Sequence, residues 1–230
     1  MGIAIHYSGR IANRLHLPQL IEEVQEIASV HGWKSHVYEN EFPAITECDT
    51  QSDTLNNTEH NGLLYGIDFT PEGSEPVSVC FLSNGKMSTI MQLACWGSFE
   101  KESRLTLETG ELDANGEWIH STDSLKLAEA EYKRMLYMCS TKTQFAGPDV
   151  HELIIGVLRY ISKTYLADFK LTDEAEFWET GNKKLLVDNF TRNSMLINSF
   201  SNKLQSAEQM PDEDLDSFIR RILRGLKNDE

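Results

Sequence analysis

Two short segments concentrate the side chains that could do chemistry. The first runs from Thr141 to His151 and contains Lys142, Gln144 and a Gly-Pro pair. The N-terminus of a helix offers free N–H groups and a positive dipole end to an anion, and Lys142 and His151 would add positive charge there. The alternative is a capped connection in which Pro148 occupies the first helical turn. A phosphate-binding loop would contain more glycines, so we favour the capped connection.

The second segment spans residues 173–181 and is acidic. Four carboxylates fall within seven residues, and they could bind a divalent cation or supply an acid–base pair. The order of its oxygen-bearing residues does not match an EF-hand loop. The alternative is an acidic turn whose Phe177 and Trp178 pack on the core. We favour this alternative, because charged runs are usually solvated.

Our first hypothesis of function is an acidic interaction or regulatory protein. The alternative is an enzyme or small-ligand binder whose site joins residues 142–151 to residues 173–179. Its candidate binding residues are Lys142, Gln144, His151, Glu174, Trp178 and Glu179. A helix of about 16 residues separates the two segments and spans roughly 24 Å. They therefore lie near opposite ends of that helix unless the chain doubles back after Asp168. We assign no catalytic residue.

Patterns typical of metal, redox and nucleophilic sites are missing from the sequence. The four cysteines form no CxxC pair, and the histidines form no HxH or HExxH motif. There is no GxSxG motif, no Walker loop and no GxGxxG motif. Cys139 is close in sequence to Lys142 and His151, but a cysteine in a buried strand behaves as a small apolar residue. We predict four free thiols, no metal and no cofactor.

The charge of the chain limits its partners. There are 36 acidic and 21 basic residues, a net charge of −15. Binding to nucleic acid requires basic residues that neutralise phosphates, so we expect no nucleic-acid partner. No run of 18 apolar residues predicts a membrane span, and the N-terminus does not resemble a signal peptide. We expect a cytoplasmic protein with a basic protein partner or a homodimer.

The N-terminal part of the chain predicts strands around one helix. Ile3, Ile5 and Tyr7 alternate with less apolar residues, which indicates a first strand. A helix follows from about Pro18 to the stop signal at Gly32. Further strands are expected over residues 33–38, 63–69, 77–82 and 86–96. This βαββββ order predicts an α+β fold with an N-terminal antiparallel sheet and a covering helix.

Turn residues indicate two hairpins in this part. Asn84-Gly85 would join residues 77–82 to residues 86–96. Residues 99–122 would form the second hairpin, with Leu105 and Leu107 before a turn at residues 113–116. Residues 39–61 hold six acidic residues and no Lys or Arg, so we expect a solvated surface loop there.

Helical periodicity dominates the rest of the chain. We predict a helix around residues 125–135, a short strand within 137–145, and helices over about 150–165 and 186–204. Residues 1–205 would form one α+β unit, sheet-rich over 1–122 and helix-rich over 123–205. A C-terminal amphipathic helix over 212–228 would pack on that unit. Its basic residues lie toward its end, where they complement the helix dipole.

Three strings in this sequence resemble a group of uncharacterised bacterial cytosolic proteins that carry similar strings in the same order. They are HYSGR at residues 6–10, KTQFAGP with His151 at residues 142–151, and DE..FWETG at residues 173–181. The resemblance covers about residues 1–200. It implies a bacterial cytosolic origin and one contiguous unit, and it implies no activity.

Overall fold

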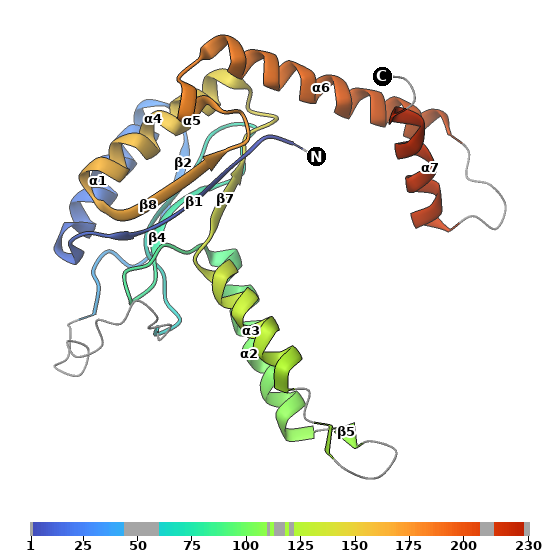
Figure 1. Cartoon of the computed structure of the whole chain (residues 1–230). Coiled ribbons are helices and arrows are strands. Elements are labelled where there is room, and N and C mark those ends of the chain that lie inside the picture. Colours follow the sequence, from blue (N-terminus) through green and yellow to red (C-terminus); the bar gives the residue numbers. More distant parts are fainter. Residues whose placement is uncertain are drawn as a thin grey trace.

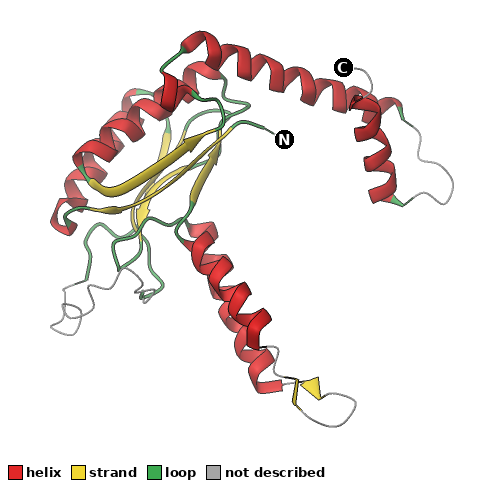
Figure 2. Ribbon diagram, in the orientation of Figure 1, coloured by secondary structure: helices red, strands yellow, loops and turns green. Residues whose placement is uncertain are grey.

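The computed structural model describes residues 2–43, 60–109, 111–112, 118–119, 122–207 and 214–227. Within these ranges the protein has an α+β fold, as the sequence predicts, with strands and helices gathered in a body from which two pairs of helices project (Figures 1 and 2). Most of the loop expected at residues 39–61 and the turn expected at residues 113–116 lie outside the described residues.

The first sheet is antiparallel and has the strand order β7-β1-β8. It combines β1 (Ala4–Ile11) with β7 (Cys139–Lys142) and β8 (Leu166–Asp173). Alternation in β1 places Ile5 and Tyr7 in the core, while His6 and Ser8 face the other way and are half-buried. The first strand therefore pairs with two strands from far along the chain.

The second sheet is also antiparallel and has the order β2-β3-β4. It contains β2 (Lys34–Val37), β3 (Tyr65–Thr70) and β4 (Val77–Phe81). Gly66 has φ +133°, and a Cβ atom there would lie 2.3 Å from the carbonyl oxygen of Val79. Only glycine fits at this position of β3. The hydroxyl of Tyr7 joins the two sheets, because it donates to the carbonyl of Ser78 and accepts from the same residue's N–H.

Helices cover the body. The 3₁₀ helix η1 (Arg14–His16) leads into α1 (Leu17–Val30), which packs on β3. Its buried face consists of Leu17, Leu20, Ile21, Val24 and Ala28. The helices α4 (Pro148–Thr164) and α5 (Phe177–Thr180) pack on β8. The expected helix limits near Pro18 and Gly32 are confirmed, as is a helix that begins after Gly147.

The expected strand over residues 86–96 is wrong, and so is the expected hairpin over most of residues 99–122. After the Asn84-Gly85 turn, Lys86 and Met87 form only isolated bridges, with Arg10 and Phe81 respectively. Residues Ile90–Thr109 form α2, and the hydroxyl of Thr89 accepts the N–H of Gln92. Thr-x-x-Gln is a helix-start pattern. This signal overrides the strand preference of the segment.

The helix α2 packs along α3 (Thr122–Leu136), and the pair projects from the body (Figure 1). Two short strands, β5 (Glu111–Leu112) and β6 (Trp118–Ile119), pair between them. A small second core lies at the base of the pair and contains Leu64, Cys80, Leu82, Trp96 and Leu136. Part of the portion expected to be sheet-rich is therefore helical.

The helices α6 (Lys183–Ser206) and α7 (Leu215–Lys227) form the second projection, here called the C-terminal arm. Asn182 starts α6 by accepting the N–H groups of Lys184 and Leu185. The first half of α6 buries Leu186, Asn189 and Phe190, and its second half extends away from the sheets (Figure 1). The helix α7 contacts α6 and buries Phe218. The expected importance of this packing for stability stays a prediction.

Candidate functional site

The two candidate segments, residues 141–151 and residues 173–181, meet because the chain doubles back after α4. The strand β8 runs antiparallel to β1 and pairs Asp173 with Ile5, while Ile5 also pairs with Thr141 of β7. The end of β8 therefore reaches the start of α4. This return strand was not expected from the sequence, and it makes contact between the two segments possible.

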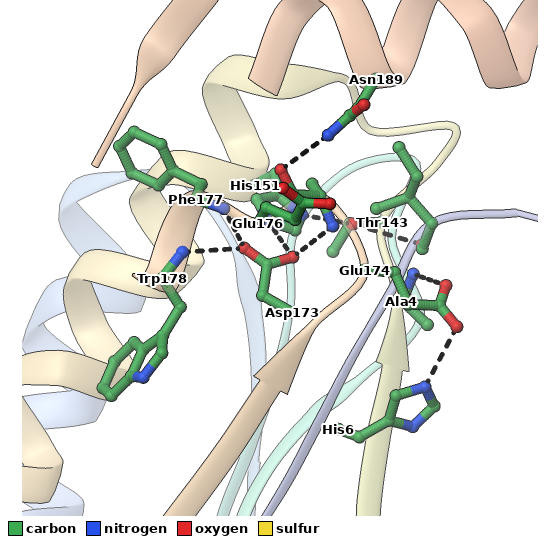
Figure 3. A network of polar contacts seen from close by, with 12 residues as sticks. Ala4, His6, Thr143, His151, Asp173, Glu174, Glu176, Phe177, Trp178 and Asn189 are labelled. Atoms are coloured by element: carbon green, nitrogen blue, oxygen red, sulfur yellow. Dashed lines mark hydrogen bonds and ion pairs between the residues drawn. The ribbon is translucent and has the colours of Figure 1, made fainter. Parts of the chain in front are cut away.

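A buried polar cluster forms where they meet (Figure 3). Oγ1 of Thr143 lies 2.7 Å from Nδ1 of His151, and Nε2 of His151 lies 3.1 Å from Oδ1 of Asp173. The second contact has ion-pair distance, but the ring is not aligned for a regular hydrogen bond. The side chains of His151 and Asp173 are fully buried, and Thr143 is 0% exposed.

Asp173 also starts the turn into α5. Its Oδ1 accepts the N–H of Ala175, and its Oδ2 accepts the N–H groups of Phe177 and Trp178, at 2.8–3.0 Å (Figure 3). Burial by itself raises the pKa of the Asp173 carboxyl, but contact with His151 and these N–H groups outweighs burial and lowers that pKa. Asp173 is therefore a carboxylate at neutral pH.

Amide side chains extend the cluster to α6. Gln144 is buried, its Oε1 accepts the N–H of Ile3 and the amide of Asn193, and its Nε2 donates to Ser194. Asn189 donates to the carbonyl of Ala175 (Figure 3). The cluster thus fastens the start of β1, the end of β7 and the turn before α5 to the same helix.

The order hydroxyl, imidazole, carboxylate is that of a nucleophilic relay. A relay must expose its nucleophile to a substrate, whereas Thr143 and His151 are both 0% exposed. Both oxygens of Asp173 are already engaged with backbone N–H groups. In this arrangement the three residues stabilise the fold and do not contact a substrate.

The other candidate residues lie in two different places. Lys142 is half-buried on the outer face of the first sheet, beside Gly2. Glu174 is exposed, accepts the N–H of Ala4 at 2.8 Å and lies 3.4 Å from His6 (Figure 3). Trp178 is half-buried, with the Arg159 guanidinium 5.0 Å from its ring centre.

Glu179 is exposed in the first turn of α5. Gln144 and His151 are covered by the protein itself, whereas Lys142 and Glu174 lie on the outer face of the first sheet. The hypothesis of a shared ligand site stays a prediction. Two members of the observed cluster, Thr143 and Asp173, were not among the candidate binding residues, because their roles depend on a long-range contact.

A second polar group centres on Asp68 of β3. Its carboxylate accepts the hydroxyls of Tyr38 and Ser78 and contacts the thiol of Cys80 at 3.3 Å. Burial, followed by the nearby Asp68 charge, raises the pKa values of Cys80 and Cys139. Both thiols stay protonated, so neither is an activated nucleophile. This agrees with the expected apolar role of Cys139.

Charges of opposite sign are segregated along the chain. Residues 15–85, here called the acidic segment, contain twelve acidic residues and one basic residue, Lys34. The helices of the C-terminal arm contain eight basic and two acidic residues. In α1, Glu22 and Glu26 are exposed, and so is Glu41 after β2. The net charge of −15 is therefore far from evenly distributed.

Metal ligation and membrane insertion find no support in the described ranges. No group of three or more His, Cys, Asp or Glu side chains there could hold a metal ion. None of the helices described is long and apolar enough to cross a membrane. No protein family, no curated protein and no solved structure matches this chain.

Proposed function

We propose that this protein is an interaction protein whose acidic segment engages a basic protein partner. The observation that carries this proposal is that residues 15–85 contain twelve acidic residues and only one basic residue. An excess of acidic residues attracts basic partners and accelerates their association, and the attraction falls with ionic strength. A cytoplasmic location belongs to the proposal and is supported by the free thiols of Cys80, Cys95 and Cys139.

The geometry of the buried cluster supports a binding role over catalysis. Thr143, His151 and Asp173 carry the only relay-like arrangement that we find in the described residues, and all three are engaged and enclosed. The acidic side chains of α1 and of the chain after β2 are exposed instead. Solvent-facing charges are the ones that a protein partner can reach.

The test is capture of a partner from the native cell by the immobilised full chain. A variant with Glu22→Gln, Glu26→Gln and Glu41→Gln removes three exposed charges of the acidic segment. The matched control, with Glu100→Gln, Glu131→Gln and Glu179→Gln, removes three exposed charges elsewhere. We expect a basic protein retained at low salt by the wild type and the control, and lost by the first variant. Equal retention by both variants, or no retained protein, would contradict the proposal.

A second candidate function is the binding of a small anion on the outer face of the first sheet. Its support is that Lys142, Lys170 and His6 lie on this face with the hydroxyls of Ser140 and Thr172 between them. Backbone amide shifts in titrations with inorganic phosphate and with acetate test it. Saturable shifts in β1, β7 and β8 that vanish in Lys142→Ala would support it, and their absence would dismiss it.

A further inference from the structure

The C-terminal arm exposes apolar and basic side chains together. Met195 is 67% exposed and Leu215 is 70% exposed, although both belong to helices. Both Met195 and the neighbouring Leu196 lie on a solvent-exposed face of α6 that also carries Asp188, Thr191, Arg192 and Ser199. Exposed apolar side chains that are grouped on one element typically mark an interaction surface.

The helix α7 lies far from α1 of its own chain. A helix of 24 residues is about 36 Å long, and α6 carries α7 away from the sheets. In Figure 1 α7 and α1 lie at opposite sides of the molecule. The length of α6 alone exceeds the electrostatic screening length of about 8 Å at physiological ionic strength. The charges of α7 and α1 therefore do not attract each other within one copy of the chain.

The outer surface of α1 complements the arm in both charge and apolarity. Glu22 and Glu26 are exposed there, and α1 contains no basic residue. Leu15, just before α1, is 85% exposed, and Val30 at its end is 83% exposed. This surface of α1, with acidic residues flanked by exposed apolar side chains, is suited to bind an amphipathic basic helix.

We infer that the C-terminal arm docks on the α1 surface of a second copy of this chain, reciprocally, so that two copies close a dimer. Each copy supplies one arm and one acidic surface, which is the condition for a closed two-fold assembly. This inference rests on the proposed function, because the arm of the second copy is a basic partner for the same acidic segment. A foreign basic partner would then compete with self-association.

The test is sedimentation equilibrium of the full chain at 50 mM and 500 mM salt. We expect a dimer at low salt and at least a tenfold larger dissociation constant at high salt. Arg220→Glu with Arg224→Glu reverses the net charge of α7, and Glu22→Lys with Glu26→Lys reverses the net charge of α1. Each double variant alone should be monomeric.

An equimolar mixture of the two double variants should restore the dimer, because each α7 then meets an α1 surface of opposite sign on the other variant. Misfolding cannot produce this rescue. A monomeric wild type at low salt, or two variants that dimerise normally, would overturn the inference. If the protein is a monomer that still captures a basic protein, the inference fails and the proposed function is supported. If it is a dimer that captures no basic protein, the inference is supported and the proposed foreign partner is not.

Discussion

The stability of the fold depends strongly on the buried contact between His151 and Asp173. We expect Asp173→Asn to lower the free energy of unfolding by about 3–5 kcal/mol, because it removes one partner of a buried pair. The substitution also replaces an oxygen that accepts backbone N–H groups with an amide that donates. The variant Asp168→Asn is the matched control. Its carboxylate pairs with Arg10 at 2.9 Å, but both side chains are more than half exposed, so its loss should cost less than about 1 kcal/mol.

Urea denaturation at pH 7, followed by far-ultraviolet circular dichroism, measures both variants. The midpoint should fall for Asp173→Asn with an unchanged slope, which separates a loss of stability from a change in the unfolded state. Should the two variants differ by less than about 1 kcal/mol, the buried contact would contribute no more than a surface pair. The importance that we assign to the cluster would then be refuted.

The same carboxyl predicts a pH dependence. Its pKa is lower in the folded protein than in the unfolded chain, where an aspartate titrates near about 3.9. A lowered pKa contributes stability that is fully present above the unfolded value and is lost as the pH falls through the folded value. The difference in unfolding free energy between wild type and Asp173→Asn should therefore narrow below about pH 4. A constant difference from pH 7 to pH 3 would contradict this assignment.

Three further outcomes are expected. Thiol titration of the denatured, unreduced protein should count four thiols, and a count of two would reveal a disulfide. In the native protein Cys80 and Cys139 should react more slowly than the half-buried Cys95, because both are buried and their pKa values are raised. Gly66→Ala should destabilise the protein by more than about 1 kcal/mol, because the added Cβ would meet Val79. Gly97→Ala in α2, where nothing lies within 4 Å of the added Cβ, should stabilise the protein by about 0.5–1 kcal/mol. Equal effects of the two substitutions would refute the steric argument. Deletion of residues 208–230 should lower the melting temperature or cause aggregation, because it uncovers the part of α6 that contacts α7; an unchanged, soluble protein would show that α7 is a detachable element.

Local signals predicted the parts of the fold that depend on neighbouring residues. Pro18 and Gly32 mark the limits of α1, and the Gly147-Pro148 pair precedes α4. The turn at Gly85 also forms, with φ +80°. The segment after that turn was mispredicted, although the Thr89-x-x-Gln92 pattern was visible in the sequence. The apolar residues around it suit a strand equally well, so the pattern received too little weight.

Long-range pairing could not be predicted in the same way. The strand β1 pairs with β7 and β8, and the registers that join Ile5 to Thr141 and to Asp173 link residues more than 130 positions apart. Alternation along β8 shows that residues can form a strand, but it does not select the partner of that strand. The contact of His151 with Asp173 depends on this partner. The two segments were recognised from the sequence, and their shared cluster was not.

The position of the cluster connects the buried polar residues to the proposed interaction surface. Gln144 forms hydrogen bonds with Asn193 and Ser194, and Asn189 forms one with the turn before α5. The cluster is therefore hydrogen-bonded to the first half of α6 at several points. Apolar contacts such as those of Leu186 and Phe190 hold a helix against the body but permit it to slide or rotate, whereas hydrogen bonds are directional. The polar contacts therefore set the direction in which α6 leaves the body. In the inferred dimer the arm reaches a second copy at a defined angle, so this buried network would serve assembly as well as stability.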